Sequence, residues 1–462
     1  MKTFREKFIG DKAFYKALFA VAIPITIQNG ITNFVSLLDN IMVGQLGTEQ
    51  MSGVAIVNQL MFVYYLCMFG GLSGVGIFTA QYFGCGDDEG IRHTFRYKFW
   101  LGVVISSIVA AVLLLFGENL IGLYLNGSSD GGDLEATLMY GEQYLKVILL
   151  MFPAMCIGQL YTTTLRECGE TFVPMVAGVV AVFINLSFNY LLIYGKFGFP
   201  EMGVRGAAIA TALSRYVEML IVVGWAYAHR NTHTYFKGIF KTLRVPVALI
   251  KKFFITGMPI LINEGLWSAG IAMLTQAYSI RGLNVVAGQN ISSTINNLFN
   301  IAFIAQGDAV AIIVGQYLGS GDMEKARDTD NKIIAFAIMS SALVAILMFF
   351  TAPLFPRFYN TTDEAKLIAT GFLMVQAIVM PKDALLHTCY FTIRAGGKTI
   401  ITFFFDSVFM ILVSVPVAYI FTRYTSLAAP IVFAIVHAFD LIKCVIGIIL
   451  VKKGVWMKNI VS

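Results

Sequence analysis

The stretch Gln81-Tyr82-Phe83-Gly84-Cys85-Gly86-Asp87 occurs a second time, 235 residues later, as Gln316-Tyr317-Leu318-Gly319-Ser320-Gly321-Asp322. Further residues match at the same offset, and another group matches at an offset of 228. Such self-similarity indicates that the chain consists of two related halves. The matched pairs are Pro24 with Pro259, Gly30 with Gly265, Gly53 with Gly288, Pro153 with Pro381, Arg166 with Arg394, Gly169 with Gly397 and Thr171 with Thr399.

Composition places both halves in a membrane. Of the 462 residues, 57% are hydrophobic and only 13% are charged, whereas soluble domains carry about 25% charged residues. Apolar runs long enough to cross a bilayer recur along the chain without alternating polarity, which predicts an all-α, polytopic protein. The predicted spans are 17–41, 52–82, 97–117, 138–161, 171–194, 203–228, 253–279, 287–317, 332–354, 366–392, 399–422 and 427–450.

The twelve predicted spans divide into two sets of six, so both halves have the same orientation. We expect two bundles related by a pseudo-two-fold axis along the membrane normal. The predicted domains are an N-terminal lobe, 1–228, a basic linker, 229–252, and a C-terminal lobe, 253–462. The matched prolines lie in apolar runs and are expected to kink helices; they are Pro24, Pro153, Pro259 and Pro381.

Basic residues set the predicted orientation. If both termini are cytoplasmic, the inner segments hold 23 Lys and Arg residues and the outer loops hold six. Lys and Arg are enriched in cytoplasmic loops. The sequence therefore predicts a multi-pass protein of the plasma membrane with both termini and the 229–252 linker in the cytoplasm.

Several motifs, in this order, resemble those of the MATE (multidrug and toxic compound extrusion) transporters. They are Pro24, Asp39-Asn40-Ile41-Met42-Val43-Gly44-Gln45-Leu46-Gly47, the 81–86 stretch, Leu165-Arg166-Glu167-Cys168-Gly169-Glu170-Thr171 and Gly203-Val204-Arg205-Gly206-Ala207-Ala208-Ile209-Ala210-Thr211. The resemblance implies two six-helix lobes around a V-shaped cavity. It also implies secondary active efflux of small, often cationic, organic compounds by antiport with Na⁺ or H⁺.

Three acids in the second half are candidates for the coupling site. At 1.5 Å per helical residue, Glu264, Asp308 and Asp383 lie about 16–18 Å from the predicted cytoplasmic edge. Ionisable groups at that depth are costly and by default mark a pathway or relay. Carboxylates suit a hard cation or a proton, so Na⁺ could bind at Glu264 and Asp383. Lys382 adjoins Asp383, and the sequence leaves open whether it neutralises one of the acids.

The resemblance adds roles for individual residues. Asp383 matches the span-ten aspartate of the NorM-like branch. Asp39 matches the first-lobe aspartate that DinF-like members use for coupling. The partner acid of that aspartate falls here on Asn189, four residues after Asn185. We therefore expect a first-lobe polar pocket with one acid and two amides, and a fourth candidate coupling residue in Asp39.

There are two alternative functions, of which only the second belongs to another class of protein. A lipid-linked intermediate flippase of the same superfamily would need a basic cavity, and the candidates here are acidic. A membrane-embedded enzyme would need a catalytic constellation, but the five histidines have no metal-ligand spacing. No cofactor is expected beyond the transported Na⁺ or H⁺. The expected partners are a cationic organic substrate and membrane lipid, without nucleic acid, and the chain is expected to be a monomer.

Overall fold

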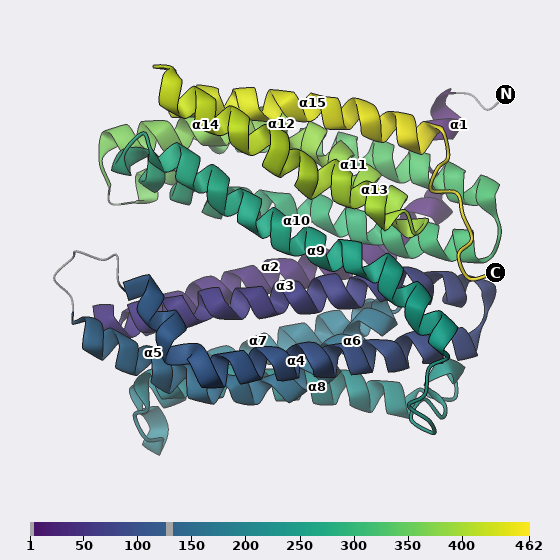
Figure 1. Cartoon of the computed structure of the whole chain (residues 1–462), viewed down its shortest axis with the longest axis horizontal. Helices are drawn as coiled ribbons and strands as arrows, with labels where there is room; N and C mark the ends of the chain where they lie inside the picture. Colours follow the sequence, from purple (N-terminus) through teal and green to yellow (C-terminus); the bar gives the residue numbers. More distant parts are fainter. Residues whose placement is uncertain (1–3, 126–132, 360) are drawn as a thin grey trace. The chain divides into compact units, whose positions relative to one another are not determined.

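The computed structural model describes residues 4–125, 133–359 and 361–462. Every regular element in this part of the chain is a helix (Figure 1). Ten helices of the described chain are long and apolar enough to cross a membrane, and a bent helix at Leu283–Gly319 makes eleven. The remaining predicted span, the seventh at 253–279, is also helical, but polar residues such as Asn263 and Glu264 lower its hydropathy. The all-α prediction is therefore confirmed.

The first half contains six predicted spans, and the fourth is broken in two. The short α1 (Phe4–Phe8) precedes them. Pro153 stands at the start of α6, after a 3-10 turn, because proline fits the first turn of a helix but not its interior. The helices are α2 (Lys12–Gly44), α3 (Thr48–Cys85), α4 (Asp88–Leu125), α5 (Leu134–Ile148), η1 (Leu149–Met151), α6 (Phe152–Glu167), α7 (Phe172–Tyr194), η2 (Lys196–Gly198) and α8 (Gly203–Ala228).

The second half repeats this order with one irregular span. Two consecutive π-helical segments, 404–408 and 410–414, interrupt the eleventh span. Pro24, Pro259 and Pro381 lie inside α2, α9 and α12. The helices are η3 (Thr234–Phe236), α9 (Val247–Ser279), α10 (Leu283–Gly319), α11 (Met323–Thr351), η4 (Phe355–Phe358), α12 (Asp363–Ala395), α13 (Thr399–Phe403), η5 (Phe404–Val408), η6 (Met410–Ser414), α14 (Val415–Tyr424) and α15 (Ala429–Lys452).

The repeated motif forms the same helix ending twice. The amide of Asp87 donates to the carbonyl of Tyr82 at 2.9 Å, and that of Asp322 donates to the carbonyl of Tyr317 at 3.2 Å. Gly86 and Gly321 have φ angles of +74° and +80°. A left-handed residue with this hydrogen bond is the Schellman ending, which favours glycine. The repeated spacing within the motif thus has a structural cause, since it ends one helix and allows the next to begin.

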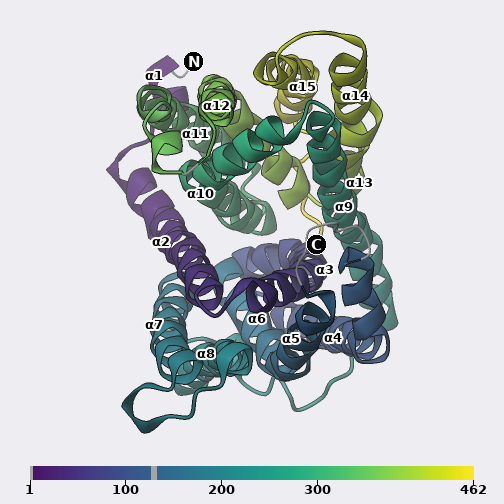
Figure 2. The same cartoon turned by 90° about the vertical axis from the view of Figure 1, so that its left-hand side faces the viewer.

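The chain forms two compact units whose limits fall inside helices. The N-unit comprises Ile27–Thr79 and Asp88–Phe253, and the C-unit comprises the described residues up to Thr26, Ala80–Asp87 and Phe254–Ser462. In Figure 2, α7 and α8 lie side by side in the N-unit, and α10, α11 and α12 pack together in the C-unit. The repeat-based limits 1–228 and 253–462 stay a prediction, because they describe sequence similarity rather than compactness.

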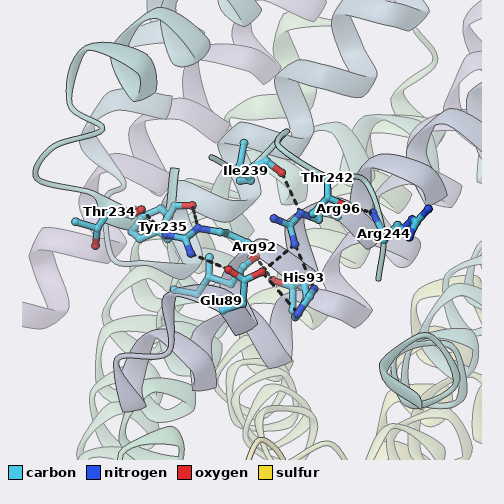
Figure 3. Close-up of polar contacts among 11 residues, drawn as sticks. Glu89, Arg92, His93, Arg96, Thr234, Tyr235, Ile239, Thr242 and Arg244 are labelled. Carbon is cyan, nitrogen blue, oxygen red and sulfur yellow. Dashed lines mark hydrogen bonds and ion pairs between the residues drawn. The ribbon is translucent and has the colours of Figure 1, made fainter. Parts of the chain in front are cut away.

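Residues 234–243 of the linker are bound by side chains of α4 within the N-unit, and Figure 3 shows the contacts of Arg92 and Arg96. Arg92, Arg96 and Trp100 follow one another at intervals of four residues, so they lie on one face of α4. Glu89 accepts from Arg92 at 2.7 Å and from Arg96 at 2.9 Å, which fixes both guanidinium groups. Arg92 donates to the backbone carbonyls of Thr234 and Tyr235. Arg96 donates to that of Ile239 and Trp100 to that of Leu243, and all four distances are 2.9–3.3 Å.

Candidate functional site

The N-unit contains a polar pocket around Asp39. Asn185 and Asn189 lie one turn apart on α7 and therefore face the same side. The amide of Asn189 donates to Asp39 Oδ1 at 2.6 Å. When the amide nitrogen of Asn185 faces the carboxylate, it donates to the two Asp39 oxygens at 2.8 and 3.1 Å. Its oxygen then accepts from the Thr211 hydroxyl at 3.2 Å. We call Asp39, Asn185, Asn189 and Thr211 the Asp39 pocket.

The Asp39 pocket offers oxygen ligands. Asn189 is only 1% exposed, and its amide oxygen has no hydrogen-bond partner among the described residues. An unpaired buried polar atom is costly unless something completes it. The Asp39 carboxylate, which accepts from both amides, can bind a hard cation such as Na⁺ or take up a proton. The arrangement can therefore hold one small cation.

Charged residues on α8 border this pocket and were not anticipated from the sequence. Arg215 donates to Glu218 at 2.7 Å, and its charge acts on Asp39. With all three groups ionised, their net charge is one negative charge. The signal was present in the sequence, because two charges three residues apart interrupt an otherwise apolar span and must pair inside a bilayer.

The C-unit acids have separate surroundings. Asp383 Oδ1 lies 2.8 Å from the ammonium of Lys382, and Asp383 Oδ2 accepts from the amide of Gln376 at 3.1 Å. The charged groups that act on Glu264 are Arg394 and Asp406. Asp308 is half-buried on α10. Glu264 and Asp383 therefore have different charged neighbours, and the coupling roles of all three acids stay predictions.

Another buried carboxylate was missed. Asp330, on α11, is 1% exposed and accepts from the Thr392 hydroxyl at 2.6 Å. It lies seven residues into its helix, next to a basic segment, and therefore resembles a loop-facing charge in the sequence. Its burial results from the packing of α11 against α12, which hydropathy does not specify.

Solved MATE structures share this fold. A crystal structure of a mutant of the Vibrio cholerae MATE transporter VcmN matches the chain with a TM-score of 0.84 at 16% identity. The match covers 97% of this chain and 98% of that chain. MATE structures have twelve helices in two bundles, which is the architecture expected from the repeated halves.

Sequence comparisons agree with the fold. A protein of Thermotoga maritima named probable multidrug resistance protein NorM is 27% identical over 417 residues, which are 89% of this chain and 86% of that protein. Multidrug resistance protein PmpM of Pseudomonas aeruginosa is 28% identical over 397 residues, 85% of this chain and 80% of that protein. The MatE family model matches residues 24–191 and 259–420, one segment in each half. The chain therefore belongs to the MatE family of multi-pass membrane transporters and is not an enzyme.

Proposed function

We propose that the chain is a secondary active exporter of small, often cationic, organic compounds, driven by antiport with Na⁺ or H⁺. It works in the plasma membrane with both termini cytoplasmic, by alternating access of its two lobes. The names of its relatives support export of drugs. The basic inner segments support the orientation. No resident cofactor takes part, since the coupling cation is itself transported.

The Asp39 pocket is the observation that carries the coupling mechanism. Its surplus negative charge can be balanced by one cation at a time. When a coupling cation or a cationic substrate occupies the carboxylate, the other is disfavoured by charge repulsion. Competition for one carboxylate couples the two fluxes, because binding of one cation favours release of the other. The same negative charge disfavours the phosphate of a lipid-linked intermediate.

Reconstituted protein in liposomes tests this proposal. Efflux of an organic cation such as ethidium is measured while the Na⁺ and pH gradients are imposed separately. We expect one gradient to accelerate efflux of the unmodified protein, and Asp39→Asn to lose that acceleration. Asp363→Asn is the matched control, because Asp363 lies exposed at the start of α12. An efflux rate that depends on neither gradient contradicts the proposal, as does a gradient-driven acceleration that is unchanged in Asp39→Asn.

A further inference from the structure

Lys382 lies at the centre of an acid cluster in the C-unit. Its ammonium lies 2.8 Å from Asp383 Oδ1 on the same helix and 3.2 Å from Asp440 Oδ2 on α15. It also lies 3.2 Å from His437 Nδ1 and 3.4 Å from the His437 carbonyl. All four side chains are half-buried. We call Lys382, Asp383, His437 and Asp440 the Lys382 cluster.

We propose that Lys382 is a tethered cation that occupies the place where a free coupling ion would otherwise bind in the C-unit. The proposal rests on the coupling mechanism above and deepens it. It assigns the exchangeable cation to the Asp39 pocket and removes Asp383 from the coupling site. Lys382 is thus a positioning residue whose ammonium occupies the cation site of the second lobe throughout the transport cycle.

The ligand geometry supports this reading. The ligand atoms of Asp383, His437 and Asp440 all lie within 4.8 Å of one another, which is close enough to share one ion. An ammonium group with three protons can satisfy several acceptors at once. Here its contacts are two carboxylates, a ring nitrogen and a carbonyl. The other Asp383 oxygen accepts from the Gln376 amide at 3.1 Å.

A bound lysine is also favoured by its tether. Two neighbouring carboxylates in a membrane interior are strongly destabilised unless a positive charge neutralises them. A lysine on the same helix as Asp383 is present at a very high effective concentration, so millimolar ions in solution compete poorly with it. The two lobes therefore differ in the partner of their basic residue. In the first lobe the Arg215 guanidinium pairs with Glu218, which leaves the Asp39 carboxylate available to an exchangeable cation.

Removing the lysine charge should expose the site. In Lys382→Met the apolar stem remains, but two carboxylates and one imidazole are left without their cation. Histidine and carboxylate ligands together suit divalent transition metals. We therefore expect purified Lys382→Met in detergent to gain one Co²⁺ site, detected by calorimetry and by visible absorbance. Its affinity should exceed any binding by the unmodified protein at least 100-fold.

Two controls separate the site from general effects. Lys443→Met also removes a membrane lysine, one that lies 3.6 Å from Asp406 instead, and should gain no such site. Lys382→Met combined with Asp440→Asn should lose most of the gained affinity. Equal Co²⁺ binding by the unmodified protein and Lys382→Met overturns the proposal, as does a folded Lys382→Met without a new site.

A second measurement covers the case in which Lys382→Met does not fold. Na⁺ and proton dependence of substrate binding is compared between the unmodified protein and Asp383→Asn, with substrate binding itself as the sign of folding. We expect the cation dependence to be the same within about twofold. Loss of that dependence in Asp383→Asn, with Asp39 intact, places the exchangeable cation in the C-unit and overturns the proposal. These binding assays need no gradient, so they do not depend on transport.

Discussion

Gly84 packs directly against the backbone carbonyl of Gln316, and the repeat makes this contact twice. Gly319, the counterpart of Gly84, packs against the carbonyl of Gln81, the counterpart of Gln316. Reciprocal contact between equivalent positions is the mark of two-fold symmetry. The two copies of the motif that reveal the repeat in sequence are thus in contact in the C-unit.

Replacing Gly84 with alanine should destabilise the protein. A Cβ at this position would overlap the Gln316 carbonyl, and backbone atoms cannot move aside easily. Overpacking of this kind costs about 1–3 kcal/mol. Thermal unfolding in detergent should show a lower Tm for Gly84→Ala. Gly224→Ala in α8 is the control, because a Cβ there meets nothing within 4 Å; equal Tm values for both variants would argue against the contact.

The buried ion pair between Lys98 and Glu167 offers a second test. Lys98 is fully buried, and its ammonium contacts the Glu167 carboxylate. At the repeat offsets their counterparts are Ile333 and Ala395, which are both buried and apolar. Lys98→Ile alone should lower stability by about 3–5 kcal/mol, because it removes the buried ammonium that neutralises the Glu167 carboxylate.

The second half of the chain indicates which second substitution should compensate for the loss of Lys98. Lys98→Ile with Glu167→Ala recreates the apolar pair of Ile333 and Ala395, so it should recover most of the lost stability. Chemical unfolding of the single and double variants measures this. A double variant that is less stable than Lys98→Ile alone would mean that the two side chains contribute independently.

Glu218 should protect the Asp39 pocket from its neighbour Arg215. In Glu218→Gln the guanidinium loses its anionic partner and can turn towards Asp39, where it would act as a competing tethered cation. We expect the half-saturating concentration of the coupling cation in efflux assays to rise at least tenfold. Glu218→Gln with Arg215→Met should bring it back. An unchanged value in Glu218→Gln would show that Arg215 does not reach Asp39.

Arg96 should hold the linker on α4. Its side chain is only 3% exposed and donates to the Ile239 carbonyl at 3.0 Å. Arg96→Ala removes this bond and the contact with Glu89, so the 237–244 segment should become more sensitive to trypsin at Lys237 and Lys241. Arg244 is exposed and serves as the control. Cleavage rates that rise equally in Arg96→Ala and Arg244→Ala would contradict the anchoring role.

The sequence predicted the helices and their order, because long apolar runs and a repeated motif are strong local signals. It did not predict the π-helical segments 404–408 and 410–414, because they do not change the hydropathy of the span. It also missed the continuation of α4 to Asp88, because Arg92 and Arg96 resemble loop charges. Those charges instead bind the linker carbonyls, which only tertiary contact can reveal.

The site was predicted in part. Asp39, Asn185 and Asn189 were expected to share a pocket, and the structure brings them together. For the second half, an estimate of depth placed Glu264, Asp308 and Asp383 at one level. Depth does not give the direction in which a side chain points around its helix. Lys382 and Asp440, which contact each other from α12 and α15, therefore could not be paired from sequence alone.

Binding of substrate and coupling cation to one carboxylate is the central claim, and reciprocal binding in purified protein tests it most directly. The Kd for an organic cation is measured at increasing Na⁺ and at decreasing pH, for the unmodified protein and for Asp39→Asn. We predict that the Kd of the unmodified protein rises with one of the two cations, and that the bound substrate weakens that cation by the same factor. In Asp39→Asn the Kd should be independent of both cations. A Kd that still rises to the same extent in Asp39→Asn would contradict the account.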